Sequence, residues 1–232
     1  NANVVDNIEK TFSVEQGSEF QLDNINGSVA INAWENSTIR VSATIKADNQ
    51  EDRDNIVIDM KQSASGLTVE TRYKERASWK RNDSGKVEYI IMVPNNVSLS
   101  AINLVNGSLT IDNVKGAVQA ELVNGSIKAN GLASNSKLSS VNGSIKVNYG
   151  ELSTDLKEIN LETVNGSIKL YVPHSFDATI EAETMHGSIK TEFGLVAEKN
   201  VFTGRQLSGK IGSGDVRVTL SSVNGSIKVL NH

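Results

Sequence analysis

Few side chains in this sequence are of the types that catalyse reactions or bind metals. There is no cysteine, which excludes disulfides, thiolate nucleophiles and cysteine–zinc sites. The three histidines, His174, His186 and His232, fit no metal-binding motif. Gly212–Asp215 resembles part of a phosphate-binding loop, but a strand pattern follows it, so it lacks the helix N-terminus that binds anions. We predict no catalytic, cofactor-binding or metal site, and a protein that is not an enzyme.

One set of lysines has the chemistry of a binding surface. Each lysine follows the string Gly-Ser-Ile, at Lys128, Lys146, Lys169, Lys190 and Lys228. If the copies of this string stack, the lysines form one row beside rows of asparagine and serine, and such a row could bind an anionic glycan. The alternative is that lysine only keeps an extended sheet soluble and prevents edge-to-edge association. Like charges about 5 Å apart would repel each other, which favours this second interpretation.

A basic segment supplies a second candidate surface. Residues 72–86 contain six basic and two acidic side chains, in a chain whose net charge is −4. Tryptophan among cations is suited to stacking on a carbohydrate, to a membrane interface or to a pocket in a partner. The alternative is a solvated hairpin tip with the indole packed back on the strands. The candidate binding residues of this segment are Arg76, Trp79, Lys80 and Arg81.

A short repeat must position these side chains. The string Val-Asn-Gly-Ser-Ile-Lys or a close relative recurs, with degenerate copies around Gly116 and Gly209. From Gly107 onward the glycines, with Gly209 included, are 18, 18, 23, 21, 22 and 16 residues apart, a period that suits one or two strands and a corner. The alternation of apolar and polar residues has the period of a half-buried strand. The clear copies lie around Gly27, Gly107, Gly125, Gly143, Gly166, Gly187 and Gly225.

The phase of the alternation changes once in every copy. Ala120 and Leu122 are on one phase, whereas Val123, Gly125 and Ile127 are on the other. A side chain cannot change faces along an unbroken strand, so the slip predicts a bulge or a corner. We interpret it as the repeated corner of a coil, with valine, glycine and isoleucine facing inward and glycine lying just past the bend, where a side chain would obstruct either the turn or the neighbouring coil. The alternative is a sandwich of hairpins with Asn-Gly at their tips.

The fold class predicted is all-β, a right-handed β-solenoid or β-helix-like stack of repeats with a more conventional β-rich N-terminal part. Residues 1–95 hold one clear repeat and two polar loops, Ala47–Asn55 and Lys74–Lys86, and residues 96–232 hold the repeat region. The two parts form separate domains or one continuous elongated domain. Candidate strands in the first part are Val29–Ala33, Ile39–Ile45, Ile56–Met60, Leu67–Tyr73 and Val87–Val93.

Composition limits the compartment and the partners. The acidic balance excludes the basic signature of a nucleic-acid-binding protein. No window approaches 18 consecutive apolar residues, so we predict no transmembrane helix. The sequence begins at Asn1 without methionine, so a removed targeting segment is one interpretation, although a trimmed chain would look the same.

These motifs together resemble a known family. Gly27–Trp34, the Val-Pro strand ends at Pro94 and Pro173, and the repeated Asn-Gly-Ser-Ile-Lys are similar to the bacterial β-strand-repeat proteins called putative adhesins, a domain of unknown function. The resemblance extends from about Thr11 to Val229. It implies a right-handed β-solenoid-like fold in an exported protein, periplasmic or on the bacterial cell surface. It brings no catalytic residues.

Two classes of function follow. The first is a non-enzymatic adhesin or scaffold of the cell envelope, or a secreted one, that binds a glycan, a matrix component or a protein. The second is a carbohydrate-active enzyme on a β-helix, a polysaccharide lyase or hydrolase. Against it, Glu121, Glu162 and Glu183 are expected near the corners as solvated charges rather than as a catalytic pair. We also predict an end-to-end homodimer through an unpaired edge at Ser222–Leu230.

Overall fold

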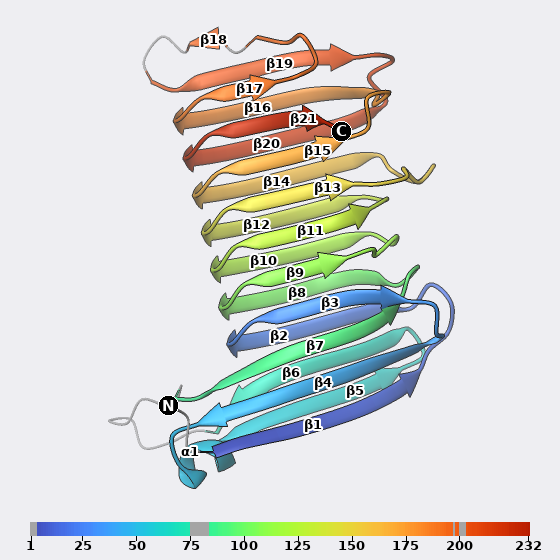
Figure 1. Ribbon diagram of the computed structural model, residues 1–232, viewed down its shortest axis with the longest axis vertical. Coiled ribbons are helices and arrows are strands. Elements are labelled where there is room, and N and C mark those ends of the chain that lie inside the picture. The colour runs from blue at the N-terminus through green and yellow to red at the C-terminus, as the bar shows by residue number, and fades with distance from the viewer. Residues whose placement is uncertain (1–3, 75–83, 197, 200–202) are drawn as a thin grey trace.

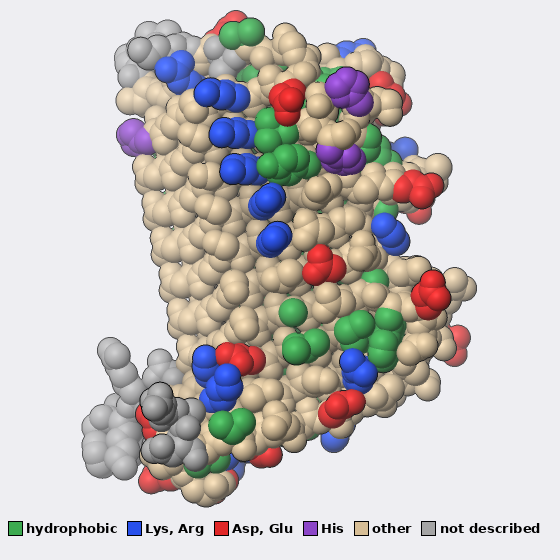
Figure 2. All heavy atoms as spheres, in the orientation of Figure 1, with side chains coloured by type: hydrophobic (Ala, Val, Ile, Leu, Met, Phe, Trp, Pro, Cys, Tyr) green, Lys and Arg blue, Asp and Glu red, His purple; other side chains and the backbone are tan. Residues whose placement is uncertain are grey.

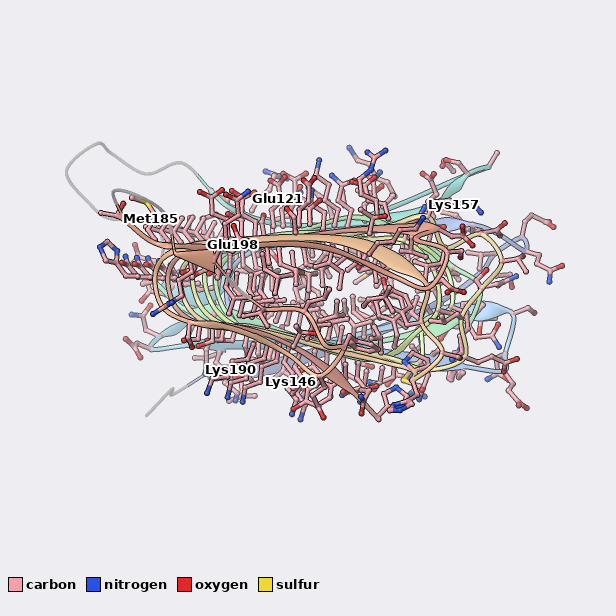
Figure 3. The ribbon with its side chains drawn as sticks, turned by 90° about the horizontal axis from the view of Figure 1, so that it is seen from above. Glu121, Lys146, Lys157, Met185, Lys190 and Glu198 are labelled. Carbon is pink, nitrogen blue, oxygen red and sulfur yellow. The ribbon has the colours of Figure 1, made fainter. Side chains whose placement is uncertain are left out.

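The computed structural model describes residues 4–74, 84–196, 198–199 and 203–232. In this part of the chain two long sheets lie face to face, and the strands of both run across the long axis of the molecule (Figure 1). Viewed along that axis, side chains fill the space between the sheets and also project from both outer faces (Figure 3). The predicted all-β solenoid-like stack is confirmed.

Sheet A has ten strands. In spatial order they are β1 (Val4–Ser13), β4 (Thr38–Ala47), β7 (Lys86–Pro94), β3 (Val29–Trp34), β9 (Leu109–Asp112), β11 (Ile127–Leu132), β13 (Ile145–Tyr149), β15 (Ile168–Val172), β21 (Ile227–Asn231) and β17 (Ile189–Thr191).

Sheet B has eleven strands. In spatial order they are β18 (Glu198–Lys199), β19 (Arg205–Ile211), β16 (Ala178–His186), β20 (Val216–Asn224), β14 (Glu158–Asn165), β12 (Ser136–Asn142), β10 (Val118–Asn124), β8 (Ser98–Asn106), β2 (Glu19–Asn26), β6 (Gly66–Tyr73) and β5 (Ile56–Ser63). The five strands predicted in the N-terminal part are confirmed within a few residues. The predicted loop Ala47–Asn55 contains a short helix, α1 (Gln50–Asp54).

A coil consists of a strand of sheet B, a corner and the next strand of sheet A. The coils are β2–β3, β8–β9, β10–β11, β12–β13, β14–β15, β16–β17 and β20–β21, and equivalent strands of neighbouring coils pair in parallel. Pairing across the predicted boundary at residue 95, between β2 and β8 and between β3 and β9, continues both sheets. The division into two domains stays a prediction.

The order of the strands in space differs from their order in the chain at both ends of the stack. The first coil, β2–β3, lies between strands β6 and β7 on one side and β8 and β9 on the other. The last coil, β20–β21, lies between β14–β15 and β16–β17. The predicted unpaired edge at Ser222–Leu230 is therefore wrong, because β20 and β21 are paired on both sides. The end-to-end homodimer loses its basis.

Each corner requires glycine because the neighbouring backbone lies too close for a side chain. A Cβ atom on Gly143 would lie 1.9 Å from the carbonyl oxygen of Gly125, and one on Gly225 would lie 1.8 Å from that of Gly166. The amide of Gly143 donates to the Asn165 carbonyl at 3.0 Å, which holds consecutive corners together. The predicted corner is confirmed, and close approach of the next coil is the reason for its glycine.

The inward positions around the corner differ from the prediction at one residue. Leu122 and Ile127 are buried, but Val123 between them is 42% exposed. The alternation of buried side chains stops at Leu122 and begins again at Ile127. Within the corner, the valine side chain therefore points outward. Threonine or serine takes the position of Leu122 in several coils, and the hydroxyl of Thr163 donates to the Gly143 carbonyl oxygen at 2.7 Å. Buried polar groups need such partners.

Candidate functional site

The lysines of the repeat form one continuous row on the outer face of sheet A. Parallel pairing aligns Lys128 with Lys146, Lys146 with Lys169, Lys169 with Lys228, and Lys228 with Lys190. We call this row the lysine ladder (Lys128, Lys146, Lys169, Lys228 and Lys190). It is visible as a line of basic side chains along the molecule (Figure 2). Because the last coil is inserted, Lys228 precedes Lys190 in space.

The ladder repeats at the spacing of β-strands. Neighbouring strands lie about 4.8 Å apart, so the ladder extends over about 19 Å. Lys128, Lys146, Lys169 and Lys190 are exposed, and Lys228 is half-buried. The ladder presents ammonium groups at regular intervals along a straight line, as a linear polymer of regularly spaced anions would require.

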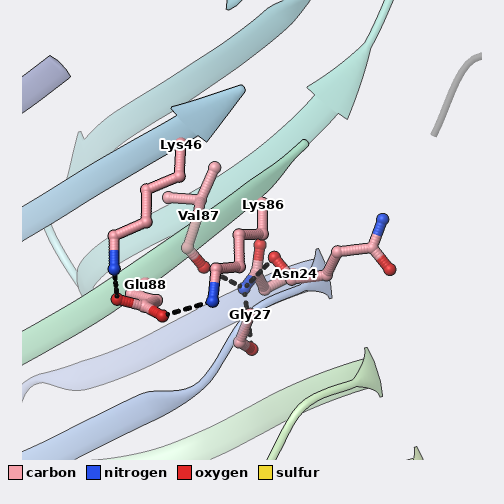
Figure 4. Close-up of polar contacts among 7 residues, drawn as sticks. Asn24, Gly27, Lys46, Lys86, Val87 and Glu88 are labelled. Carbon is pink, nitrogen blue, oxygen red and sulfur yellow. Dashed lines mark hydrogen bonds and ion pairs between the residues drawn. The ribbon is translucent and has the colours of Figure 1, made fainter. Parts of the chain in front are cut away.

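Among the residues that the structure describes, none of the ladder lysines forms an ion pair, so no carboxylate neutralises their charge. Two other lysines of sheet A, Lys46 and Lys86, are paired. Lys46 and Lys86 each lie 2.9 Å from a carboxylate oxygen of Glu88 (Figure 4). Hydrogen bonds from Lys86 and then Lys46 hold the pKa of Glu88 below its ordinary value. Aligned cations without such a partner repel each other, so the ladder carries an electrostatic cost that a bound anion would offset.

Side chains beside the ladder are polar or aromatic. The Nζ of Lys146 lies 5.5 Å from the centroid of the Tyr171 ring, within the range of a cation–π interaction. On the other side, toward the corner, runs the row of repeat serines, and the amide of Ser167 donates to the hydroxyl of Ser144 at 3.1 Å. These groups could accept or donate hydrogen bonds to the hydroxyls of a carbohydrate.

An asparagine ladder runs along the narrow edge of the stack, where the corners lie. In each step the side-chain amide donates to the side-chain oxygen of the preceding coil, for example from Asn142 to Asn124 at 2.8 Å and from Asn165 to Asn142 at 2.7 Å. His186 takes the asparagine position in coil β16–β17, beside Asn224. The members are Asn26, Asn106, Asn124, Asn142, Asn165 and Asn224. These hydrogen bonds hold the corners in one line. The lysines, which lie three residues after the corner glycine and four after the asparagine, are therefore held in line as well.

The outer face of sheet B carries a row of the opposite charge. Glu121, Glu162 and Glu183 are exposed and lie in one row, separated by Ser139 and Ser221. We call these three glutamates the acidic row. Glu121 projects from the face opposite to Lys146 and Lys190 (Figure 3). The glutamates do lie near the corners, as predicted, but their alignment in one row on sheet B depends on the pairing of strands.

Beside the acidic row runs a stripe of exposed apolar side chains from the corners. The side chains of this stripe are 37–46% exposed. Between the row and the stripe, over strands β2, β8, β10 and β12, lies a groove of about 460 Å³. The apolar stripe consists of Val105, Val123, Val141, Val164 and Met185. This surface was not predicted from the sequence, because the alternation pattern placed these residues on the buried side. The buried threonines and serines just before the corner were the available signal.

The remaining residues singled out in the sequence are those of the basic segment and the histidines. Arg76, Trp79, Lys80 and Arg81 lie outside the described residues. The described residues hold no cluster of histidine and carboxylate groups that could bind a metal ion. The ring Nε2 of His232 lies 2.7 Å from the carbonyl oxygen of Tyr149, a contact at the end of the chain rather than part of a site.

The fold and the ladders define a class of protein, a parallel β-solenoid whose corners are glycines and whose outer faces carry rows of identical side chains. Within that class, the chain belongs to the Toastrack DUF4097 family, whose model matches residues 10–230. The predicted resemblance to a β-strand-repeat family of unknown function is confirmed. No curated protein matches the chain. Among the described residues, no helix is long and apolar enough to span a membrane.

A solved structure shares the fold. A protein from Clostridium sporogenes described as a putative cell adhesion protein is 15% identical, with 98% of this chain and 100% of that chain covered and a TM-score of 0.59. A putative adhesin from Bacteroides fragilis is 12% identical, with 97% of each chain covered and a TM-score of 0.46. The first of these likenesses, at 15% identity, establishes the fold alone.

Proposed function

We propose that this chain is a non-enzymatic, exported protein of the bacterial surface or periplasm that binds an anionic polymer, an acidic glycan, along the lysine ladder. The observation that carries the proposal is the row of five aligned lysines without ion pairs. A polymer with regularly spaced carboxylates or sulfates would remove the repulsion between these lysines and contact several of them at once.

Two further observations support this proposal. The hydrogen-bonded asparagine ladder holds the backbone of the lysine ladder straight, so a ligand would have to order only the lysine side chains. The structural neighbours described as putative adhesins are consistent with a binding role. A protein or matrix partner would have to present anions at the same spacing.

The alternative of a carbohydrate-active enzyme would use Glu121 and Glu162, which line a small hollow of about 110 Å³ on sheet B. Both side chains are exposed, and the strand between them places serine at the same level. A general acid usually requires burial to raise its pKa. We therefore retain the binding function alone.

The test is retention of the purified chain on immobilised polygalacturonate, with neutral dextran as the comparison matrix. We expect retention on the acidic glycan that weakens as salt rises, because screening shortens the range of charge interactions. The variant Lys146→Gln/Lys169→Gln/Lys228→Gln should lose at least about tenfold in affinity, the equivalent of about 1.4 kcal/mol.

A matched control removes the same charge elsewhere. Lys61→Gln/Lys137→Gln/Lys157→Gln changes three exposed lysines that lie outside the ladder. It should bind nearly as the parent chain does. Equal losses in the two variants would reduce the effect to net charge, and unchanged retention of the ladder variant would refute the proposal.

A further inference from the structure

The acidic row and the lysine ladder occupy equivalent places on the two outer faces. Glu121 immediately precedes Leu122, the last buried residue of β10, and Lys128 immediately follows Ile127, the first buried residue of β11. Glutamate and lysine therefore lie at equal distances from the corner, one on each side of the coil. The same seven-residue separation joins Glu162 to Lys169 and Glu183 to Lys190.

This arrangement makes each of these coils electrically polar across its thickness. The glutamates project from sheet B and the lysines from sheet A, as the opposite positions of Glu121 and Lys146 illustrate (Figure 3). The described residues provide no ion pair to Glu121, Glu162 or Glu183. Both rows of charge thus remain available to a partner.

We propose that a second copy of this chain docks sheet A against sheet B, with its lysine ladder on the acidic row. Two copies have the same coil spacing, so their rows stay in step over the whole contact. Moving one copy perpendicular to the sheets, without rotating it, places lysines of one copy opposite glutamates of the other. The pairs are Lys128 with Glu121, Lys169 with Glu162 and Lys190 with Glu183. Charge complementarity selects this pairing, since sheet A on sheet A would oppose two rows of lysine.

The groove and the apolar stripe of sheet B favour the same occupant. The groove lies between the acidic row and the stripe, and Glu121, Val123 and Val141 all line it. Long lysine side chains can lay their apolar stems on valine while their ammonium groups reach carboxylates. Serine between successive glutamates, at Ser139 and Ser221, leaves room opposite Lys146 and Lys228.

The contact is heterologous, because it joins two different surfaces. Each docked copy leaves one sheet A and one sheet B free, so the assembly is an open lateral stack rather than a closed dimer. The paired rows extend over only about 19 Å, a small interface. We expect weak association that depends on concentration and on salt. This inference does not rest on polymer binding, although a bound polymer would compete for the ladder.

The test is sedimentation velocity of the full chain over a series of concentrations. At about 0.01 M salt, where the Debye length is about 30 Å, the average mass should rise with concentration. At about 1 M salt, where it is about 3 Å, the chain should sediment as a monomer. A monomer at every concentration in low salt would overturn the inference.

Charge-reversal variants assign the association to the two faces. Glu121→Lys/Glu162→Lys/Glu183→Lys should remain monomeric alone, and so should Lys128→Glu/Lys169→Glu/Lys190→Glu. An equimolar mixture of the two should associate, because the basic sheet B of one meets the acidic sheet A of the other. Failure of the mixture to associate, with both variants folded by circular dichroism, would count against the docking geometry.

A neutral variant and its control separate this inference from the proposed function. Glu121→Gln/Glu162→Gln/Glu183→Gln should lose self-association but keep its retention on polygalacturonate. Glu15→Gln/Glu151→Gln/Glu192→Gln, with the same change in charge at exposed positions off the acidic row, should self-associate as the parent chain does. Association of the first variant at the parent level would refute docking and leave polymer binding untouched.

Discussion

The outer faces of sheets A and B belong to the same coils, yet they differ in charge. Sheet A presents lysine in five successive coils, whereas sheet B presents glutamate in alternate coils and an apolar stripe beside it. Inside, both sheets are lined mainly by stacked aliphatic side chains. The difference indicates that the fold is determined by the inward positions and the corners. The outward rows are therefore free to carry binding chemistry.

Substitution of a corner glycine should have the largest effect, because the corner joins the two faces. Gly143→Ala places a Cβ atom 1.9 Å from the Gly125 carbonyl oxygen, and the backbone of two coils must move apart. We expect a loss of about 4 kcal/mol in the free energy of unfolding, measured by urea denaturation. Both faces should lose their register together.

Gly150→Ala is the matched control for that substitution. The nearest atom to a Cβ there would be 3.7 Å away, an ordinary contact. The control should change stability by less than about 0.5 kcal/mol. Equal effects at Gly143 and Gly150 would show that close approach at the corner is not what requires glycine.

Adjacent residues of one strand can test whether inward and outward positions have separate roles. Leu170 is fully buried and Lys169 is exposed, both on β15. Leu170→Ala should cost about 2–5 kcal/mol, and Lys169→Ala should cost less than about 0.5 kcal/mol. Lys169→Ala should be purified fully folded and should bind the acidic glycan less tightly than the parent chain does. Leu170→Ala should not be purified fully folded. A large loss of stability in Lys169→Ala would contradict the separation of roles.

Alkaline pH should weaken the interior that the two sheets share. Tyr89 of sheet A is buried, and its hydroxyl lies 2.6 Å from that of Thr71 on sheet B. Burial raises the pKa of Tyr89 to about 12, above the ordinary value of 10. The unfolded chain loses this proton first, so stability is complete below about pH 10 and falls as pH rises toward 12, by about 2–3 kcal/mol.

Thermal or urea unfolding at several pH values measures this loss. Burial also raises the pKa of Tyr149, so part of the decline should persist without Tyr89. Tyr89→Phe should show a smaller decline between pH 10 and 12 than the parent chain. An identical decline in the two chains would exclude Tyr89 as a source.

The sequence was sufficient to predict the coils and the lysine ladder, because five of the seven clear copies place lysine at the same distance from the glycine of their corner. It could not predict the insertion of coils β2–β3 and β20–β21, since equivalent strands carry nearly the same residues and local sequence does not distinguish between neighbours. The exposure of Val123 and its counterparts was missed for a related reason. An apolar residue at a corner looks like a core residue until the hydrogen bonds between corners are known.

The acidic row was not predicted from the sequence, although Glu121, Glu162 and Glu183 each lie four residues before the glycine of their corner. The glutamates alternate in space with Ser139 and Ser221, an order that only the pairing of the strands shows. The order of Lys228 and Lys190 within the ladder has the same origin. Side chains related by strand pairing over long separations require the topology to be known first.

The most direct test of the lysine ladder as a binding surface is acetylation of the folded chain with and without polygalacturonate, read by peptide mass spectrometry. Lys137 is exposed on β12 of sheet B and serves as an internal reference on the opposite face. We predict that the polymer protects Lys146, Lys169 and Lys228 strongly and leaves Lys137 as reactive as before. Equal protection on both faces, or none on the ladder, would contradict the account.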